Sequence, residues 1–284
     1  MSDVRVLERV QRNCALGLRF IDTATGNTSV DGLQVEVYKA SQPWRRVHAL
    51  PNRNGVYVVQ TAPGLRDFEL ADAGTDALWA LPAQAMRVDV SDPQDRFLPL
   101  RFDALAPTRG LYAPLLAGLS PPQPGEVPLF SSPSRPLPDP LAVVRAQLRA
   151  LGSAQPAAWA LLGVAIGGVA RGLGLADEQG RVAVIFPYPE PERRRRASPP
   201  EPRNDFSWSL ELTAYAASGS LARAVGRSPD LGAVLSQLGA PHSVVLSLLS
   251  PPSSAPALRL DYRVPVTVRT AGAPAADASF LFFA

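Results

Sequence analysis

Three residue types that many enzyme sites need are scarce in this chain of 284 residues. It holds one cysteine, two histidines and a single lysine (Lys39) against 27 arginines. A disulfide scaffold and the usual zinc, haem and iron–sulfur sites are therefore excluded. The single lysine argues against a Walker A loop, a Schiff-base enzyme and Ser-x-x-Lys chemistry. These absences predict a protein that is not an enzyme, with no catalytic residues, no cofactor and no metal.

A long apolar run is also missing. The most apolar stretch, Ala157–Ala170, is closed by Arg171 and falls short of the ~20 residues that a membrane-spanning helix needs. Residues 1–12 are charged and lack the apolar segment of a secretory signal. We therefore expect no membrane span and synthesis in the cytoplasm without a signal peptide. Any extracellular role would require release as part of a larger particle.

Basic charge is present but dispersed. The net charge is +3, and the arginines are scattered apart from the run Arg193–Arg196, which prolines and glutamates flank. A nucleic-acid binder concentrates basic charge on one face, with aromatic residues between the charges. We expect no nucleic-acid partner, and we interpret the arginine run as a solvated loop rather than an anion-binding surface.

Proline is abundant, and apolar residues recur with a period of two. The chain has 30 prolines, where a usual content of ~5% would give about half as many. Alternation at Leu16–Phe20, Leu33–Val37, Met86–Val90 and Phe97–Phe102 is typical of short strands joined by turns. The predicted fold class is all-β, with two Ig-like or transthyretin-like β-sandwich domains and one or two short helices.

The predicted domains are residues 1–110 and 141–284, with a connector over 111–140. Nine prolines between residues 114 and 140 indicate an extended linker, or alternatively a strap on the protein or on a partner. The second domain repeats the turn spacing of the first, because Gly26 precedes Gly55 by 29 residues and Gly152 precedes Gly180 by 28. The repeat favours a strand over residues 142–150, although a proline-capped helix over 141–151 is the alternative.

The rest of the second domain is expected to be strands and one helix. We expect strands over residues 206–212, 244–249 and 258–268, and a short helix from Ser228 to Gly239. Uncharged residues 279–283 predict a final strand, which either completes the second sandwich or pairs with a partner.

Candidate nucleophilic groups are few. His48, His242 and Cys14 could serve a triad, but no Gly-x-Ser-x-Gly elbow supports one. We interpret His48 as a loop residue, His242 as a strand-end residue and Cys14 as a small core residue. Asp177 and Glu178 could act as paired carboxylates, but their context is that of a turn.

Two further patterns could bind ligands. Asp89, Asp92 and Asp95 are spaced like calcium ligands, yet the rest of an EF-hand loop is missing. The glycines between Gly163 and Gly174 do not form a dinucleotide-binding fingerprint and more simply mark a strand, a turn and a bulge.

Two groups of motifs resemble known families. Leu18–Gly26, with Asn54-Gly55-Val56-Tyr57, resembles carboxypeptidase regulatory-like (transthyretin-like) β-sandwich domains. Met86–Pro99, Arg171–Arg181 and Phe186–Pro189 are similar to proteins encoded with phage-tail-like contractile injection systems. The first resemblance implies a structural module. The second implies a component of the particle, at its baseplate or tail terminus.

The sequence as a whole predicts a structural protein that contacts other subunits of a large assembly and is oligomeric in that context. The alternative is a stand-alone binding module that recognises a carbohydrate or a cell-surface ligand. An exposed cluster of tryptophans (Trp44, Trp79, Trp159, Trp208) would favour sugar binding, whereas buried tryptophans would favour the structural role.

Overall fold

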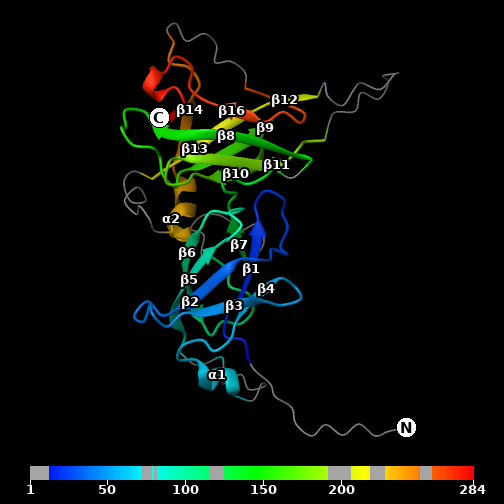
Figure 1. The fold of residues 1–284 in the computed structure, drawn as a ribbon, viewed down its shortest axis with the longest axis vertical. Coiled ribbons are helices and arrows are strands. Elements are labelled where there is room, and N and C mark those ends of the chain that lie inside the picture. Colours follow the sequence, from blue (N-terminus) through cyan, green and yellow to red (C-terminus); the bar gives the residue numbers. More distant parts are fainter. Residues whose placement is uncertain are drawn as a thin grey trace, which may run out of the picture.

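The computed structural model has two β-sandwiches stacked along its long axis (Figure 1). It describes residues 13–71, 79, 82–114, 125–137, 139–190, 206–217, 228–249 and 258–284. In these parts the chain is almost entirely strands and turns, with short helices α1 (Arg66–Leu70) and α2 (Leu231–Ser236) and two 3₁₀ turns. The predicted all-β class is confirmed.

The first sandwich is one curled sheet of seven strands, in the order β6-β5-β2-β3-β4-β1-β7. Its strands are β1 (Gly17–Asp22), β2 (Gln34–Tyr38), β3 (Val47–Pro51), β4 (Val56–Val59), β5 (Gln84–Ser91), β6 (Leu100–Ala106) and β7 (Glu126–Leu129). Strand β3 turns the corner, because Val47 and His48 pair with β2 while Ala49–Pro51 pair with β4. A bridge between Phe97 and Ser131 brings together the ends of β6 and β7.

The proline-rich segment differs from the prediction of an extended connector. Glu126–Leu129 form β7, which pairs in parallel with β1 and buries Val127 and Leu129 in the first core. Strand β7 ends the ladder of described strands, and edge strands tolerate a proline such as Pro128. Residues 115–124 and 138 of the predicted strap lie outside the described part.

The second sandwich is built on a curled sheet with the order β10-β9-β13-β14-β17-β8-β11, and β16 pairs with β8. Its strands are β8 (Leu141–Ala150), β9 (Leu161–Ile166), β10 (Val169–Leu175), β11 (Arg181–Pro187), β13 (Glu211–Tyr215), β14 (Pro241–Val245), β16 (Val266–Val268) and β17 (Leu281–Phe283). A separate ribbon pairs β12 (Ser207–Ser209) with β15 (Arg259–Asp261). Residues 142–150 are therefore a strand and not a helix.

The two sandwiches have equivalent strand pairings. Strand β1 pairs antiparallel with β4 and parallel with β7, and β8 pairs antiparallel with β11 and parallel with β17. The antiparallel run β3-β2-β5-β6 likewise corresponds to β10-β9-β13-β14. The internal repeat inferred from glycine spacing is thus present in the topology.

The turns that precede the equivalent strands β4 and β11 are also alike. Gly55 and Gly180 have φ of 71° and 74°, a conformation that costs glycine little. In each turn the side-chain oxygen of the first residue (Asn52 or Asp177) accepts from the backbone N–H groups two and four residues later, at 2.9–3.0 Å. Such side-chain caps fix a tight turn locally, which is why turn chemistry was readable in the sequence.

Several predicted elements differ in extent. The strand expected over residues 206–212 is divided between β12 and β13, and the one expected over 258–268 between β15 and β16. The strand expected over 244–249 is β14, which begins at Pro241 and ends at Val245. The helix expected from Ser228 to Gly239 is confirmed as α2 followed by a 3₁₀ turn, with the Asp230 side chain capping Ala233 N at 2.9 Å. Helix α1 and strand β3 were not predicted.

One hydrophobic core continues from the first sandwich into the second. It contains the inward residues of β1–β7 and also side chains from α2, β9 and β10 of the second half. The residues contributed by the second half are Trp159, Leu161, Leu175, Leu231, Val234 and Leu235. Because apolar burial opposes separation of the surfaces it covers, this shared core holds the sandwiches in a fixed relation.

Candidate functional site

The candidate nucleophilic residues are not assembled into a triad. His48 lies exposed on β3, so its placement in a loop is wrong. His242 lies at the start of β14 in the other sandwich, as predicted, with Nε2 3.0 Å from Ala216 O. Cys14 is exposed rather than a core residue, and its Sγ donates to Leu16 O at 3.1 Å.

The three aspartates spaced like calcium ligands have separate partners. Asp89 accepts from Arg101 at 2.6 Å and from the Tyr38 hydroxyl at 2.9 Å, whereas Asp92 accepts from Arg96 at 2.9 Å. Asp95 accepts from two serine hydroxyls. No group of three His, Cys, Asp or Glu side chains suited to a metal ion occurs among the described residues.

The remaining patterns take the structural roles that the sequence favoured. Asp177 and Glu178 lie in the turn before β11. The glycines from Gly163 to Gly174 lie on the β9–β10 hairpin, whose register shifts between Ala170 and Gly172 as a bulge would require. Arg193–Arg196 lie outside the described residues. No helix in the described parts is long and apolar enough to cross a bilayer.

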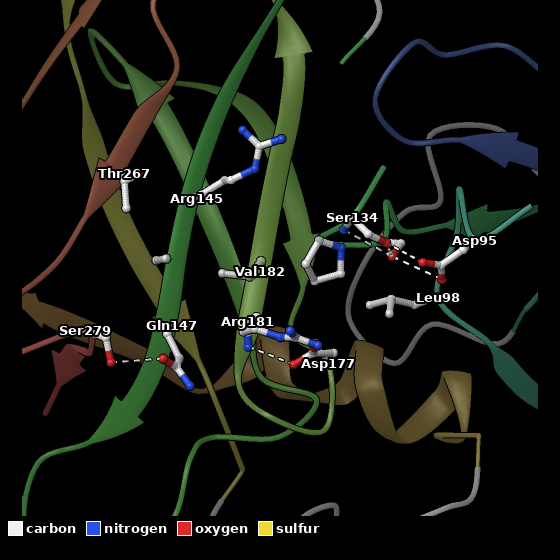
Figure 2. Close-up of a pocket in the computed structure, with 13 residues that line it drawn as sticks. Asp95, Leu98, Ser134, Arg145, Gln147, Asp177, Arg181, Val182, Thr267 and Ser279 are labelled. Atoms are coloured by element: carbon white, nitrogen blue, oxygen red, sulfur yellow. Dashed lines mark hydrogen bonds and ion pairs between the residues drawn. The ribbon is translucent and has the colours of Figure 1, made fainter. Parts of the chain in front are cut away.

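A cleft of about 550 Å³ lies where the two sandwiches meet (Figure 2). One wall belongs to the first sandwich and the segment after β7. The other wall is formed by strands β8, β11 and β16 of the second sandwich, with Asp177 before β11 and Ser279 before β17. The residues that line it are Asp95, Leu98, Ser132, Pro133, Ser134, Arg145, Ala146, Gln147, Asp177, Arg181, Val182, Thr267 and Ser279.

Strand alternation places the polar side chains on the second-sandwich wall. Along β8, Val144 and Ala146 belong to the second core, so Arg145 and Gln147 lie on the opposite face. Arg145 is opposite Ala183 of β11 and Thr267 of β16 in the ladders. Gln147 is fixed, because its Nε2 donates to Gln179 O at 3.0 Å and its Oε1 accepts from Ser279 Oγ at 3.1 Å.

The opposite wall is held by a buried ion pair. Arg135 donates to both carboxylate oxygens of Asp22, at 2.9 and 2.7 Å, and also to Ser131 Oγ at 2.9 Å. This bidentate pair ties the segment after β7 to the β1–β2 turn. Ser132 Oγ in that segment donates to Asp95 Oδ1 at 3.3 Å, and Ser134 donates to the other carboxylate oxygen.

The pKa of Asp22 reflects this network. Burial alone would raise its pKa, but hydrogen bonds from Arg135, the Ala24 amide and the Thr25 hydroxyl outweigh burial. The net result is a pKa below the ordinary aspartate value. Asp22 therefore stays ionised, and the first wall of the cleft keeps its position, across the neutral range.

Of the four charged side chains that line the cleft, Asp177 and Arg181 pair with each other, whereas Arg145 and Asp95 have no charged partner among the described residues. Asp177 pairs with Arg181 at 2.7 Å. Arg145 is half-buried, and none of the described residues gives it a hydrogen bond, an ion pair or a ring contact. Figure 2 shows Arg145 and Arg181 on neighbouring strands; of these two arginines, Arg181 alone has dashed contacts, which join it to Asp177. The cleft therefore offers one partly desolvated cation to a ligand.

The tryptophans do not form one exposed cluster among the described residues. Trp44 is 74% exposed, whereas Trp159 is buried in the shared core and Trp208 is half-buried beside Tyr188. Trp79 packs edge-on against Phe68 with ring centroids 5.0 Å apart. None of them lines the cleft.

Sequence reasoning did not single out the cleft or Arg145. The residues that line the cleft extend from Asp95 to Ser279 in the sequence, and they come together only because the two sandwiches pack against each other. The sequence of Leu141–Ala150 did contain a signal for Arg145. A cation in a strand of apolar residues must lie on the face that points away from the core.

Comparisons with known proteins add little. No protein-family model matches the chain, and no curated protein sequence matches it. Two solved structures show a weak likeness. A mutant of the shaft pilin spaA from Lactobacillus rhamnosus GG has 10% identity and a TM-score of 0.19, and covers 75% of this chain and 89% of its own. A candidate adhesin from Bacteroides ovatus has 8% identity and a TM-score of 0.20, and covers 80% and 85%. TM-scores this low do not indicate a shared fold, and the sandwich architecture is defined by the strand pairings.

Proposed function

We propose that this chain is a non-enzymatic structural subunit of a phage-tail-like contractile injection particle, located at the baseplate or the tail terminus. Its role is to contact neighbouring subunits and to hold them at a fixed separation. It is made in the cytoplasm and leaves the cell only within the particle. The type of particle is supported by the sequence resemblance of residues 86–99, 171–181 and 186–189.

The shared hydrophobic core is the observation that carries the structural role. Trp159 and the α2 residues Leu231, Val234 and Leu235 are buried against the first sandwich. Polar contacts add to this packing, because the Arg101 amide on β6 donates to Pro229 O at 2.9 Å just before α2. A tandem protein that is joined by packing as well as by its connector can transmit position and force between two contact surfaces.

Hydrogen bonding within the sheets limits where partners can bind. Strand β17 lies between β14 and β8, so the C-terminal run is an internal strand and not a free docking strand. Sheet faces, loops and the cleft are therefore the surfaces that we propose for subunit contact.

Isolation from source cells tests this function. A tagged full-length chain should co-purify with sheathed particles that are visible by electron microscopy, together with their sheath and tube proteins. A matched control with the same tag on an unrelated soluble protein should not. Recovery of the chain only as a free species, from cells that do assemble particles, would contradict the proposal.

A further inference from the structure

We propose that the cleft between the sandwiches binds an acidic segment of a neighbouring polypeptide, with Arg145 as the ligand for a carboxylate. This inference rests on the proposed function, because it names the chemistry of one subunit contact. It goes beyond that function in assigning a binding residue and the type of side chain that it recognises.

Arg145 is a half-buried arginine without a partner among the described residues. Five other arginines that are half-buried or buried each pair with a carboxylate: Arg87, Arg96, Arg101, Arg135 and Arg149. Removing a cation from water costs free energy that a nearby anion offsets, so such pairing is expected. Arg19 also has no partner among the described residues, but it does not line the cleft. Among the described arginines, Arg145 alone combines partial burial, an unpaired guanidinium and a position in a cavity.

The charged residues around Arg145 leave its guanidinium available to a ligand. Asp177 is paired with Arg181, and Asp95, which keeps its negative charge, is held on the first-sandwich wall by hydrogen bonds from two serines. On the second-sandwich wall the unpaired cation is therefore the planar fork of Arg145, which suits bidentate recognition of a carboxylate. Thr267 lies beside it in the β8–β16 ladder and can supply a hydroxyl donor.

The lining favours polypeptide over other anions. The cleft has the size of an ordinary ligand site, and the half-buried Pro133 provides apolar contact for the rest of a peptide. Among the described residues no aromatic ring lines it to stack a nucleobase, and Arg145 is the one lining cation without a partner. Its walls contain no helix N-terminus of the kind that binds free phosphate.

A direct binding experiment tests the inference on the full-length protein. The probe is a short synthetic peptide that alternates glutamate and alanine, titrated by calorimetry and by NMR of arginine Nε–Hε resonances. We expect saturable binding, a shift of the Arg145 resonance, and an affinity loss of about tenfold or more in Arg145→Gln. Arg145→Lys should bind with intermediate affinity, because it keeps the charge and loses the fork.

The matched control is Arg171→Gln on β10. Arg171 is an exposed arginine outside the cleft, so its loss should leave the affinity within about twofold if the cleft is the site. Melting temperatures of all variants establish that they are folded. The same peptide with glutamine in place of glutamate should not bind measurably.

Four outcomes would overturn the inference. These are no binding of the acidic peptide, equal binding by Arg145→Gln, equal weakening by Arg171→Gln, or tighter binding of inorganic phosphate or oligogalacturonate than of the peptide. The last outcome would assign the cleft to a small anion or an acidic sugar. A chain that still co-purifies with particles while failing the peptide test would overturn only the role of the cleft.

Discussion

At the scale of single residues, the Asp22–Arg135 pair is the contact on which the first wall of the cleft depends. Both side chains are more than nine-tenths buried, and Arg135 also lies over the Phe97 ring, 4.8 Å from its centroid. The turn around Asp22 was predictable, because Asp and Thr cap their own backbone. Its partner was not, because Arg135 lies 113 residues away and only the fold brings the two together.

Arg135→Met should lower the free energy of unfolding by ~3–5 kcal/mol near neutral pH, because it leaves a buried carboxylate unpaired. The folded pKa of Asp22 is lowered, so the pair stabilises the protein above the unfolded aspartate pKa of ~3.9. That contribution is lost as pH falls through the folded pKa of Asp22. The difference in unfolding free energy between Arg135→Met and the unmodified protein should therefore become smaller at low pH. Urea unfolding at about pH 7 and about pH 3 measures both effects.

The control for this prediction is Arg263→Met. Arg263 pairs with Asp139 at 3.4 Å on the surface, where both side chains are more than half exposed. Such a pair contributes ~0–1 kcal/mol. If Arg135→Met costs no more than Arg263→Met, the buried pair does not have the role assigned to it.

At the scale of elements, the predictable strands are those with one face in the core and the other face more accessible to solvent, because this arrangement gives an alternating sequence. Residues 86–90 of β5 alternate between buried and half-buried, and β6 alternates between buried and half-buried or exposed residues. Strand β3 was missed because it buries Ala49 alone, which leaves no alternation in its sequence. Strand β7 was missed because the prolines around it argue against regular structure. Proline is tolerated there because β7 lies at the edge of the described sheet, and the sequence does not show that position.

Strand β17 is the element whose role the sequence left open. Leu281 is fully buried in the second core, and the strand is hydrogen-bonded on both sides. Leu281→Ala should therefore cost ~2–5 kcal/mol of unfolding free energy. Deletion of residues 279–284 should unfold the second sandwich, seen as a large drop in melting temperature.

Ser279→Ala is the matched control, because Ser279 is exposed and the change removes only its hydrogen bond to Gln147, which should cost no more than ~1 kcal/mol. A truncated protein that keeps its melting temperature would show that β17 does not complete the sheet.

At the scale of the whole molecule, the repeat was foreseeable from turn spacing, but the docking of the two sandwiches was not. The amphipathic residues of α2 are visible in the sequence, yet nothing local says that Leu231 and Val234 pack on the first sandwich. Trp159 adds to this junction with a φ of 61°, and its carbonyl accepts from the buried Gln237 side chain at 2.8 Å. Such contacts arise from packing between distant parts of the chain, and the periodicity of a sequence predicts local secondary structure only.

Rigidity of the two-sandwich unit is the central claim, and a distance measurement between spin labels tests it most directly. Labels at Asn54→Cys and Ala154→Cys, in a Cys14→Ser background, place one probe on an exposed turn of each sandwich. A control pair, Asn54→Cys with Ser91→Cys, lies within the first sandwich. The shared core predicts a single distance peak between the sandwiches, as narrow as that of the control pair. A broad or multiple distribution between the sandwiches, beside a narrow control, would contradict the account.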